Sequence, residues 1–509
     1  MKLNRIVLSL CFVLALGLMS ARGEHLVILT MNDTHSHVDT DFDGKGGMLR
    51  QKVLFDSVLC AEKNVLRIHA GDAVQGTLYF SEFKGVVEYE MLNKMNFDVV
   101  IAGNHEYDNG MNDLAHYYKN VKASRLCSNY DFADTVLEGV FEPYTIREFG
   151  GRKIGFIGLN LDPNGMIVDT NSKGVGFTSI VDAANAVAGM LKREKGVDFV
   201  VAVTHIGYDM SSAELVGDVQ MVQNSTDIDL VIGGHTHTKI EAKNNTKVAW
   251  LVPNKDGKLI PITQTGNHGK AVGIIDIDLE TLKVVDYRLL PIDKRYDSRI
   301  NYPEIESFLA PYKHVVDSLM NREVAVSAKA MSRGLGALSN WTSDAARDIT
   351  AKLSGIKVDC AIMNKGGIRR SMPKGSVSEG VINSMYPFDN RLMVIELTGA
   401  QLLRSLEIMA MRGGDATSSD LRVEFTKGGK IKSAKIKGKD IKPKKKYKVV
   451  TLDYLANGGD YMTPFKEGKR LFADDVKVSE RYLDFIENLT REGKIIDADD
   501  ELRMKQVSE

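Results

Sequence analysis

The sequence predicts an α/β fold organised as two consecutive domains. Its 509 residues provide enough chain for two or three separate hydrophobic cores. From Glu24 to about Pro291, short apolar runs rich in β-branched residues alternate with helix-like stretches, which is typical of βαβ units and of layered α/β folds. After Glu323 the pattern changes, and the remaining chain has the size of a second domain.

The individual elements follow from short runs along the chain. In the first unit, the strand candidates are residues 25–31, 65–70, 98–102, 198–204 and 229–232. Residues 301–321 have apolar side chains near helical spacing, so we interpret them as a connecting helix, with plain core packing as the alternative and Pro311 as a candidate kink. In the second unit, the strand candidates are residues 359–363, 392–397, 421–425 and 447–452.

Composition and charge exclude several classes of protein. Hydrophobic residues make up 43% of the chain and charged residues 26%, which argues against disorder, collagen and a small disulfide-stapled domain. The 66 basic and 67 acidic residues give a net charge of -1. A nucleic-acid-binding protein usually has a strongly basic domain, so we expect no polynucleotide partner.

The N-terminus has the pattern of a secretory signal peptide. Two basic residues lie within the first five positions, an apolar run extends from Ile6 to Met19, and small residues follow up to Gly23. We therefore expect residues 1–23 to be a signal peptide and the mature chain to begin near Glu24. No later stretch is apolar for long enough to span a bilayer. These features predict an exported protein, either periplasmic or secreted.

Each of the five strand candidates in the first unit ends in polar residues that are able to bind a metal. Ligands of open α/β sheets gather at the carboxyl ends of strands, so we expect these five ends to converge on one crevice. In chain order, the polar residues are Asp33 and His35, Asp72, Asn104 and His105, His205, and His235 and His237.

This mixture of residues suits a pair of divalent cations. Two such cations about 3.5 to 4 Å apart repel each other and need a shared carboxylate, for which Asp72 is the natural candidate. Imidazoles and an amide oxygen favour Mn, Zn, Fe or Co over Mg or Ca. Such a pair activates a bound water as hydroxide for in-line attack on a phosphoryl group, which points to phosphate ester hydrolysis.

Taken in order, these residues resemble the signature of the metallophosphoesterase family. The matching segments are Asp33-x-His35, Gly71-Asp72, Gly103–Glu106, His205 and Gly234-His235-x-His237. The resemblance implies that one metal is bound by Asp33, His35, Asp72 and His237. It implies that the second metal is bound by Asp72, Asn104, His205 and His235.

The same resemblance gives His105 a catalytic role rather than a metal-binding one. His105 would face the scissile phosphate and stabilise it or protonate the leaving oxygen, with Asp108 orienting the imidazole. From the residues alone, Asp108 could instead cap the following helix.

Three segments of the second unit resemble the C-terminal 5'-nucleotidase domain: Asn364–Arg369, Pro387–Asn390 and Tyr454–Asp460. The resemblance implies a four-layer α/β/β/α metallophosphoesterase domain over residues 24–295 and a linker helix over residues 296–322, about which the domains rotate. It also implies a smaller α/β substrate-binding domain over residues 323–509.

Several residues of this second domain match the family's substrate contacts. Phe388 and Tyr454 would stack on the two faces of a nucleobase. The implied phosphate and nucleoside contacts are Asn364, Arg369, Asn390 and Asp460. Arg333 is a further candidate for phosphate binding, although its offset from Asn340 differs by one residue from the family pattern.

These features predict an exported metal-dependent 5'-nucleotidase that acts on nucleoside monophosphates, with nucleoside di- and triphosphates or UDP-sugars as further candidate substrates. Lys365, Asp389 and Tyr454 depart from the family's usual residues, which leaves the substrate preference open. The enzymatic alternative is a 2',3'-cyclic-nucleotide 2'-phosphodiesterase with 3'-nucleotidase activity. A non-catalytic nucleotide-binding surface protein is the alternative of another class, and its expected sign, lost metal ligands, is not seen.

Overall fold

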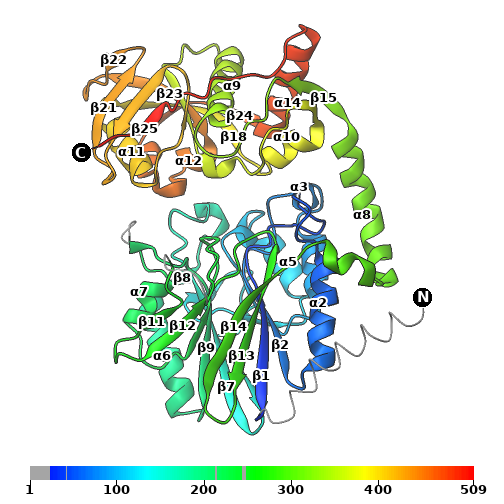
Figure 1. Cartoon of the computed structure of the whole chain (residues 1–509). Coiled ribbons are helices and arrows are strands. Elements are labelled where there is room, and N and C mark those ends of the chain that lie inside the picture. Colours follow the sequence, from blue (N-terminus) through cyan, green and yellow to red (C-terminus); the bar gives the residue numbers. More distant parts are fainter. Residues whose placement is uncertain (1–22, 42, 212–214, 243–247, 509) are drawn as a thin grey trace.

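The computed structural model describes residues 23–508 except for 42, 212–214 and 243–247. The predicted signal peptide therefore lies outside the described residues, apart from Gly23. The described chain forms two bodies, one above the other, with helix α8 (Pro303–Asn321) running along their outer side (Figure 1). No helix in the described part of the chain is long and apolar enough to cross a membrane.

Two six-stranded sheets form the N-terminal body. The first has the order β14-β13-β1-β2-β3-β4 and comprises β1 (His25–Met31), β2 (Val65–Ala70), β3 (Val99–Ile101), β4 (Ser124–Leu126), β13 (Ala271–Asp278) and β14 (Lys283–Pro291). The second has the order β11-β12-β10-β9-β7-β6 and comprises β6 (Tyr144–Phe149), β7 (Arg152–Asn160), β9 (Phe199–His205), β10 (Leu230–Ile232), β11 (Leu251–Pro253) and β12 (Leu259–Thr263). Strands β1 to β4 are parallel, as are β7, β9, β10 and β12.

Side-chain alternation along β1 explains how these sheets are layered. Leu26 and Ile28 belong to the core shared with β7, β9 and β10 of the other sheet, whereas Val27 and Leu29 pack with the outer helices. Those helices are α2 (Met48–Ala61), α4 (Val86–Lys94) and α5 (Met111–Tyr118), while α6 (Ile180–Arg193) covers the second sheet. The predicted four-layer α/β/β/α architecture is therefore confirmed.

Three predicted strands of the N-terminal body begin one residue later than the apolar pattern indicates. The leading aspartate of each lies outside the strand, because its carboxylate accepts a hydrogen bond from a backbone N–H of the neighbouring strand. The pairs are Asp98 with Arg67 at 2.9 Å, Asp198 with Lys153 at 2.8 Å and Asp229 with Val200 at 2.8 Å.

The connecting segment contains a short 3-10 helix, η4 (Lys294–Arg299), followed by α8. Pro311 lies inside α8 without ending it. Ile305, Leu309 and Val316 of α8 are buried in the core of the N-terminal body. The domain boundaries at residues 295 and 322 stay predictions, and α8 lies between them.

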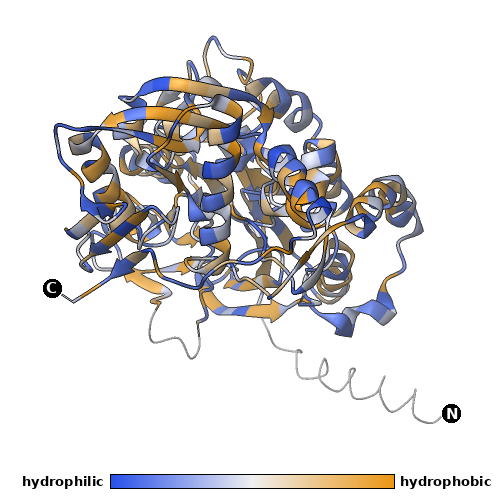
Figure 2. Ribbon diagram, turned by 90° about the horizontal axis from the view of Figure 1, so that it is seen from above, coloured by the Kyte–Doolittle hydropathy of each residue, from blue (hydrophilic) through white to orange (hydrophobic). Residues whose placement is uncertain are grey.

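The C-terminal body is also layered. A five-stranded sheet of order β19-β16-β23-β18-β24 comprises β16 (Cys360–Met363), β18 (Arg391–Thr398), β19 (Ala416–Thr417), β23 (Lys446–Leu452) and β24 (Lys469–Lys477). One face packs on α9 (Ala337–Ser354), α10 (Glu379–Met385) and α14 (Val478–Arg491). The other packs on α11 (Gly399–Met411) and on a second sheet that includes β20 (Leu421–Phe425) and β21 (Ile431–Ile436). Figure 2 shows that the helices carry both hydrophilic and hydrophobic residues, as expected of elements with one buried face.

Candidate active site

Six of the seven predicted metal-binding residues lie in loops that follow β1, β2, β3 and β10, and His205 is the last residue of β9. These strands belong to two facing sheets, so the crevice lies where the carboxyl ends of both sheets meet. The structure brings all seven residues together, with Asn104 directly before the short 3-10 helix η1 (His105–Tyr107).

The backbone of these loops is strained at the predicted metal ligands. Left-handed φ angles occur at Asp33 (50°), His35 (47°), Asp72 (53°), His235 (77°) and His237 (55°). Residues other than glycine rarely adopt this conformation, which costs about 1 to 3 kcal/mol each and is typically retained at functional sites. The loops therefore hold these side chains in a conformation that local backbone preference alone does not favour.

Two groups of side-chain donors lie within the crevice. In the first, His35 Nε2 is 2.9 Å from His237 Nε2, which is 3.3 Å from Asp33 Oδ1. In the second, His205 Nε2 is 3.1 Å from Asp72 Oδ2. Asp72 Oδ2 is also 3.9 Å from His35 Nε2, so this carboxylate lies between the groups, as predicted for a bridge.

Asn104 and His235 complete the second group. Asn104 Oδ1 lies 3.0 Å from His235 Nδ1, and the rings of His205 and His235 are 5.4 Å apart. Asp33 Oδ1 is also 3.9 Å from His205 Nε2, so Asp33 borders both groups, a proximity that the sequence did not indicate.

The electrostatics of the crevice fit a bound cation. Asp33 and Asp72 are buried, and burial opposes ionisation of both. The pKa of Asp72 is nevertheless held well below its usual range, mainly by His205, and that of Asp33 is lowered by His237 and His205. Buried carboxylates require positive charge nearby, and a divalent metal would supply it where imidazole protons otherwise do.

The orientation of His205 supports the same interpretation. Its Nδ1 lies 2.8 Å from the backbone oxygen of Ala70, so the Nδ1–H donates and the lone pair of Nε2 points into the crevice. Nε2 itself has no hydrogen bond among the described residues. Metal-binding histidines are commonly oriented through their second nitrogen in this manner. At His237 the bond runs the other way, because Asn267 Nδ2 donates to His237 Nδ1 at 3.0 Å.

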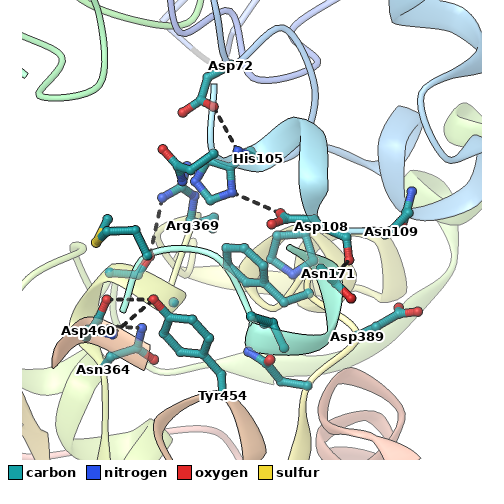
Figure 3. A pocket seen from close by; sticks show the side chains of 18 of the residues that line it. Asp72, His105, Asp108, Asn109, Asn171, Asn364, Arg369, Asp389, Tyr454 and Asp460 are labelled. Carbon is teal, nitrogen blue, oxygen red and sulfur yellow. Dashed lines mark hydrogen bonds and ion pairs between the residues drawn. The ribbon is translucent and has the colours of Figure 1, made fainter. Parts of the chain in front are cut away.

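His105 lies close to the metal-donor residues, and one of its ring nitrogens is within 4.8 Å of donor atoms of His35 and Asp72. Its Nδ1 is 2.9 Å from Asp108 Oδ2, and its backbone N–H donates to Asp72 Oδ1 at 3.0 Å (Figure 3). Burial lowers the pKa of His105, but Asp108 and Asp72 outweigh that effect and raise it overall. Asp108 does not cap the next helix, since the N-cap of α5 is Gly110 without a side-chain cap.

Glu106 is a structural residue of the site to which the sequence assigned no role. Its carboxylate accepts hydrogen bonds from the backbone N–H groups of Asp72, Ala73 and Gly103, at 3.1, 2.7 and 2.5 Å. It therefore ties the loop after β2 to the loop after β3. Its signal in the sequence is its place at the end of the matched segment Gly103–Glu106.

A cavity of about 370 Å³ extends from the metal-donor residues into the C-terminal body. Asp72, Asn104, His105, His235 and His237 line one end, which we call the metal end. Six of the seven predicted substrate contacts line the other end, the base end: Asn364, Arg369, Phe388, Asn390, Tyr454 and Asp460. The volume is within the usual range of small-molecule sites, about 300 to 1,000 Å³.

Arg333 is the predicted contact that does not line this cavity. Its backbone N–H donates to Ser371 Oγ, and its guanidinium is close enough to Arg369 to help burial lower the pKa of Arg369 to about 10. A role for Arg333 in phosphate binding stays a prediction.

Arg369 connects the two ends of the cavity. Its Nη2 lies 3.5 Å from both ring nitrogens of His35, and its guanidinium lies 5.8 Å from the ring centroid of Phe388. The ring of Phe388 is 5.9 Å from that of His105. A side chain of the C-terminal body therefore reaches the metal end.

Asp460 is held at the base end by three neighbours. The hydroxyl of Tyr454 donates to Asp460 Oδ1 at 2.9 Å, and Asn364 Nδ2 donates to Oδ2 at 3.2 Å (Figure 3). Arg412 Nη1 lies 3.2 Å from Oδ2. Tyr454 therefore contributes a hydrogen bond that phenylalanine, the usual residue, cannot make. Nothing in the sequence pattern indicated Arg412.

The other two departures from the family pattern are structural. Lys365 Nζ donates to the backbone oxygens of Arg412 and Gly414, at 2.8 and 2.6 Å, just after α11. Asp389 forms ion pairs with Lys477 at 2.7 Å and, across the two bodies, with Lys84 at 3.6 Å.

Comparison with known proteins agrees with this architecture. Residues 26–239 match the calcineurin-like phosphoesterase family, and residues 318–467 match the 5'-nucleotidase C-terminal domain family. Protein UshA of Escherichia coli (strain K12) is 27% identical over 472 residues, covering 86% of each chain. The trifunctional nucleotide phosphoesterase protein YfkN of Bacillus subtilis (strain 168) is 24% identical over 540 residues, covering 95% of this chain and 35% of YfkN. This chain therefore spans about a third of the length of that relative.

A solved structure shows the same arrangement of both bodies. The crystal structure of a 5'-nucleotidase precursor from Thermus thermophilus superimposes with a TM-score of 0.83 at 26% identity, covering 95% of this chain and 100% of that one. The fold and the crevice thus define a hydrolase of the calcineurin-like phosphoesterase class. Within that class, the chain belongs to the 5'-nucleotidase family, in which this domain is followed by a 5'-nucleotidase C-terminal domain.

Proposed function

We propose that this protein is an exported nucleotidase with two divalent metals, which hydrolyses the phosphate ester of nucleoside 5'-monophosphates. The observation that carries the proposal is a single cavity with buried carboxylates and imidazoles at one end and two aromatic side chains at the other. A nucleotide has matching parts, since its phosphate requires positive charge and its base offers flat faces for stacking.

The proposed metal ligands are the seven residues that the sequence predicted for this role. Asp33, His35, Asp72 and His237 would hold one cation, and Asp72, Asn104, His205 and His235 the other. This nitrogen-rich donor set favours Mn, Zn, Co or Fe. When bound, the two cations would supply the Lewis acidity for phosphoester hydrolysis.

The remaining groups of the site have separate proposed roles. Arg369 remains cationic at neutral pH, because burial lowers its pKa only to about 10, and it would neutralise the phosphate oxygens. His105 is bonded to Asp108 through Nδ1, which leaves Nε2–H to donate a proton to the leaving 5'-oxygen. Phe388 and Tyr454 would stack on the base, while Asn364, Asn390 and Asp460 contact the nucleoside.

Export and a wider substrate range are parts of the same proposal. The basic and apolar start of the sequence supports export. Stacking on aromatic rings tolerates different bases, which supports activity on several nucleotides, including di- and triphosphates or UDP-sugars. The similarity to YfkN, which is named a trifunctional nucleotide phosphoesterase, also supports a broad range.

The test is phosphate release from 5'-AMP, 3'-AMP, ATP, UDP-glucose and 2',3'-cyclic AMP, before and after chelation. We expect the highest kcat/KM with 5'-AMP, loss of activity in a strong chelator, and recovery with Mn, Co or Zn. Full activity in a verified metal-free sample would exclude the proposed chemistry. Preference for 2',3'-cyclic AMP and 3'-AMP would favour the phosphodiesterase alternative, and failure on every substrate would favour a binding protein.

A further inference from the structure

One segment of the N-terminal body, which we also call the catalytic body, has no assigned role and reaches from this body to the C-terminal body. Residues 162–171, which we call the strap, follow β7 and precede β8 (Gly176–Phe177). The residue before the strap is held in place, because the Tyr130 hydroxyl donates to the backbone oxygen of Leu161 at 2.5 Å. Ile167, in the middle of the strap, is buried in the core of the catalytic body, and its backbone N–H donates to Pro163 at 2.9 Å.

The strap contacts the C-terminal body at the residues that form the base end. The backbone N–H of Asp460 donates to the backbone oxygen of Gly165 at 3.0 Å. Gly165 packs closely on the ring of Tyr461, since a Cβ atom there would lie 2.9 Å from Tyr461 Cδ1. An exposed ion pair joins Asp169 to Lys466 at 2.6 Å, and such pairs add little stability. The close contact at Gly165 is therefore the main connection.

The backbone of the C-terminal body is strained where the strap meets it. Asp460 and Tyr461 both have left-handed φ angles, 55° and 61°. Two consecutive residues in this conformation require support from their surroundings. The hydrogen bond from Asp460 to Gly165 provides part of that support across the two bodies.

The same segment borders the cavity and the catalytic pair. Met166 and Val168 line the cavity and add an apolar wall to the base end. Asn171 Nδ2 donates to the backbone oxygens of Tyr107 and Asp108, at 2.9 and 3.1 Å, and Figure 3 shows it beside Asp108. One short segment thus contacts the base end, the other body and the turn that carries His105.

We propose that the strap is a specificity element that couples occupation of the base end to the position of His105 and Asp108. A base stacked in the cavity presses on Met166 and Val168, holds Gly165 against Tyr461, and thereby fixes the turn bonded to Asn171. The strap thereby raises kcat/KM for a nucleotide above that for a sugar phosphate with the same ester bond. This inference rests on the proposed nucleotidase function.

The experiment compares 5'-AMP with ribose 5-phosphate, which has the same phosphate ester but no base, in the metal-loaded full-length enzyme. In Gly165→Ala the added methyl group collides with Tyr461. We expect kcat/KM for 5'-AMP to fall about 5- to 30-fold, as for the loss of one or two interdomain contacts, and that for ribose 5-phosphate to fall less than about 3-fold.

Gly174→Ala is the matched control. Gly174 has a φ of +89°, close to the +83° of Gly165, so alanine is similarly strained at both positions. A Cβ at Gly174 would meet only Thr135 Cγ2, at an ordinary 3.5 Å, and nothing from the C-terminal body. We expect this variant to keep the wild-type ratio of the two kcat/KM values.

A second variant, Met166→Ala, tests the proposal independently in case Gly165→Ala does not fold. Met166 is half-buried, so its truncation should leave the unfolding temperature close to that of the wild type. We expect it to raise KM for 5'-AMP several-fold without a matching change for ribose 5-phosphate. Equal losses on both substrates in Gly165→Ala and Met166→Ala, or equal behaviour of Gly165→Ala and Gly174→Ala, would overturn the coupling. Failure of the wild type to hydrolyse 5'-AMP would instead refute the proposed function.

Discussion

The metal end and the base end of the cavity are built in different ways. The metal end consists of side chains from loops that directly follow strands, with buried carboxylates and several left-handed backbone angles. The base end is assembled from separate segments of the C-terminal body and the strap, and hydrogen bonds between side chains hold it in place. We therefore expect the loss of a single side chain at the metal end to lower kcat/KM severely. Substitutions at the base end should lower kcat/KM by smaller, graded amounts.

The largest expected effect is at the metal end. Asp72→Ala removes the carboxylate between the two donor groups and leaves two cations without a bridge. Its loss of kcat/KM with 5'-AMP should exceed the about 10⁴-fold upper range for a lost acid–base group, and metal analysis should find fewer ions per chain. Asp256→Ala, at an exposed acidic residue between β11 and β12, is the control and should behave like the wild type. An Asp72→Ala enzyme with wild-type activity would contradict the expected difference in sensitivity between the metal end and the base end.

His105→Ala tests whether the metal end separates metal binding from proton transfer. The imidazole lies beside the donor groups and is bonded to Asp108. We expect kcat to fall about 10²- to 10⁴-fold, the size of a lost acid, while the metal content stays at the wild-type value. A metal-free variant would show that His105 is a ligand instead.

The two ends also differ in how far the sequence predicts them. The metal-end residues stand directly after apolar strands, so their types, order and spacing identify them locally. The same strands predict a layered α/β fold, whereas the four-layer arrangement was implied only by the family resemblance. The one-residue shifts at Asp98, Asp198 and Asp229 could not be predicted, because each depends on a hydrogen bond to a neighbouring strand. The link that Glu106 makes between two loops is equally non-local.

At the base end, only the family resemblance indicated a base-stacking role for Phe388. Arg412, Met166 and Asn171 had no signal in the sequence. Their contacts join segments that are far apart in the sequence, which periodicity within a single segment does not record. The same limit applies to the hydroxyl of Tyr454, whose partner Asp460 is known only from the structure.

Tyr454→Ala should show the graded response of the base end. Loss of one stacking partner, about 1 to 3 kcal/mol per base, corresponds to a loss of about 5- to 150-fold in kcat/KM for 5'-AMP. p-Nitrophenyl phosphate has no nucleobase, so its hydrolysis should change much less. Tyr454→Phe is the matched variant, since it keeps the ring and removes only the hydroxyl, which donates to Asp460 Oδ1 and accepts from the backbone N–H of Asp460. It should lose less than Tyr454→Ala, because Asn364 and Arg412 still hold the carboxylate. Parallel losses on both substrates would assign Tyr454 to packing between the bodies.

The smallest expected effect is a shift in pH dependence at the boundary of the two ends. Asp108 raises the pKa of His105 against the opposing effect of burial, so Asp108→Asn should lower that pKa. His105 must be protonated to act as an acid, and a lower pKa means that the protonated form is lost at lower pH. The basic limb of the kcat profile for 5'-AMP should therefore move to lower pH, with a loss of about 2- to 12-fold at neutral pH, the value of one hydrogen bond. Asp113→Asn, in the first turn of α5, removes the same charge without touching His105 and should leave the profile unchanged. If both variants shift the profile equally, the cause is net charge rather than the bond between Asp108 and His105.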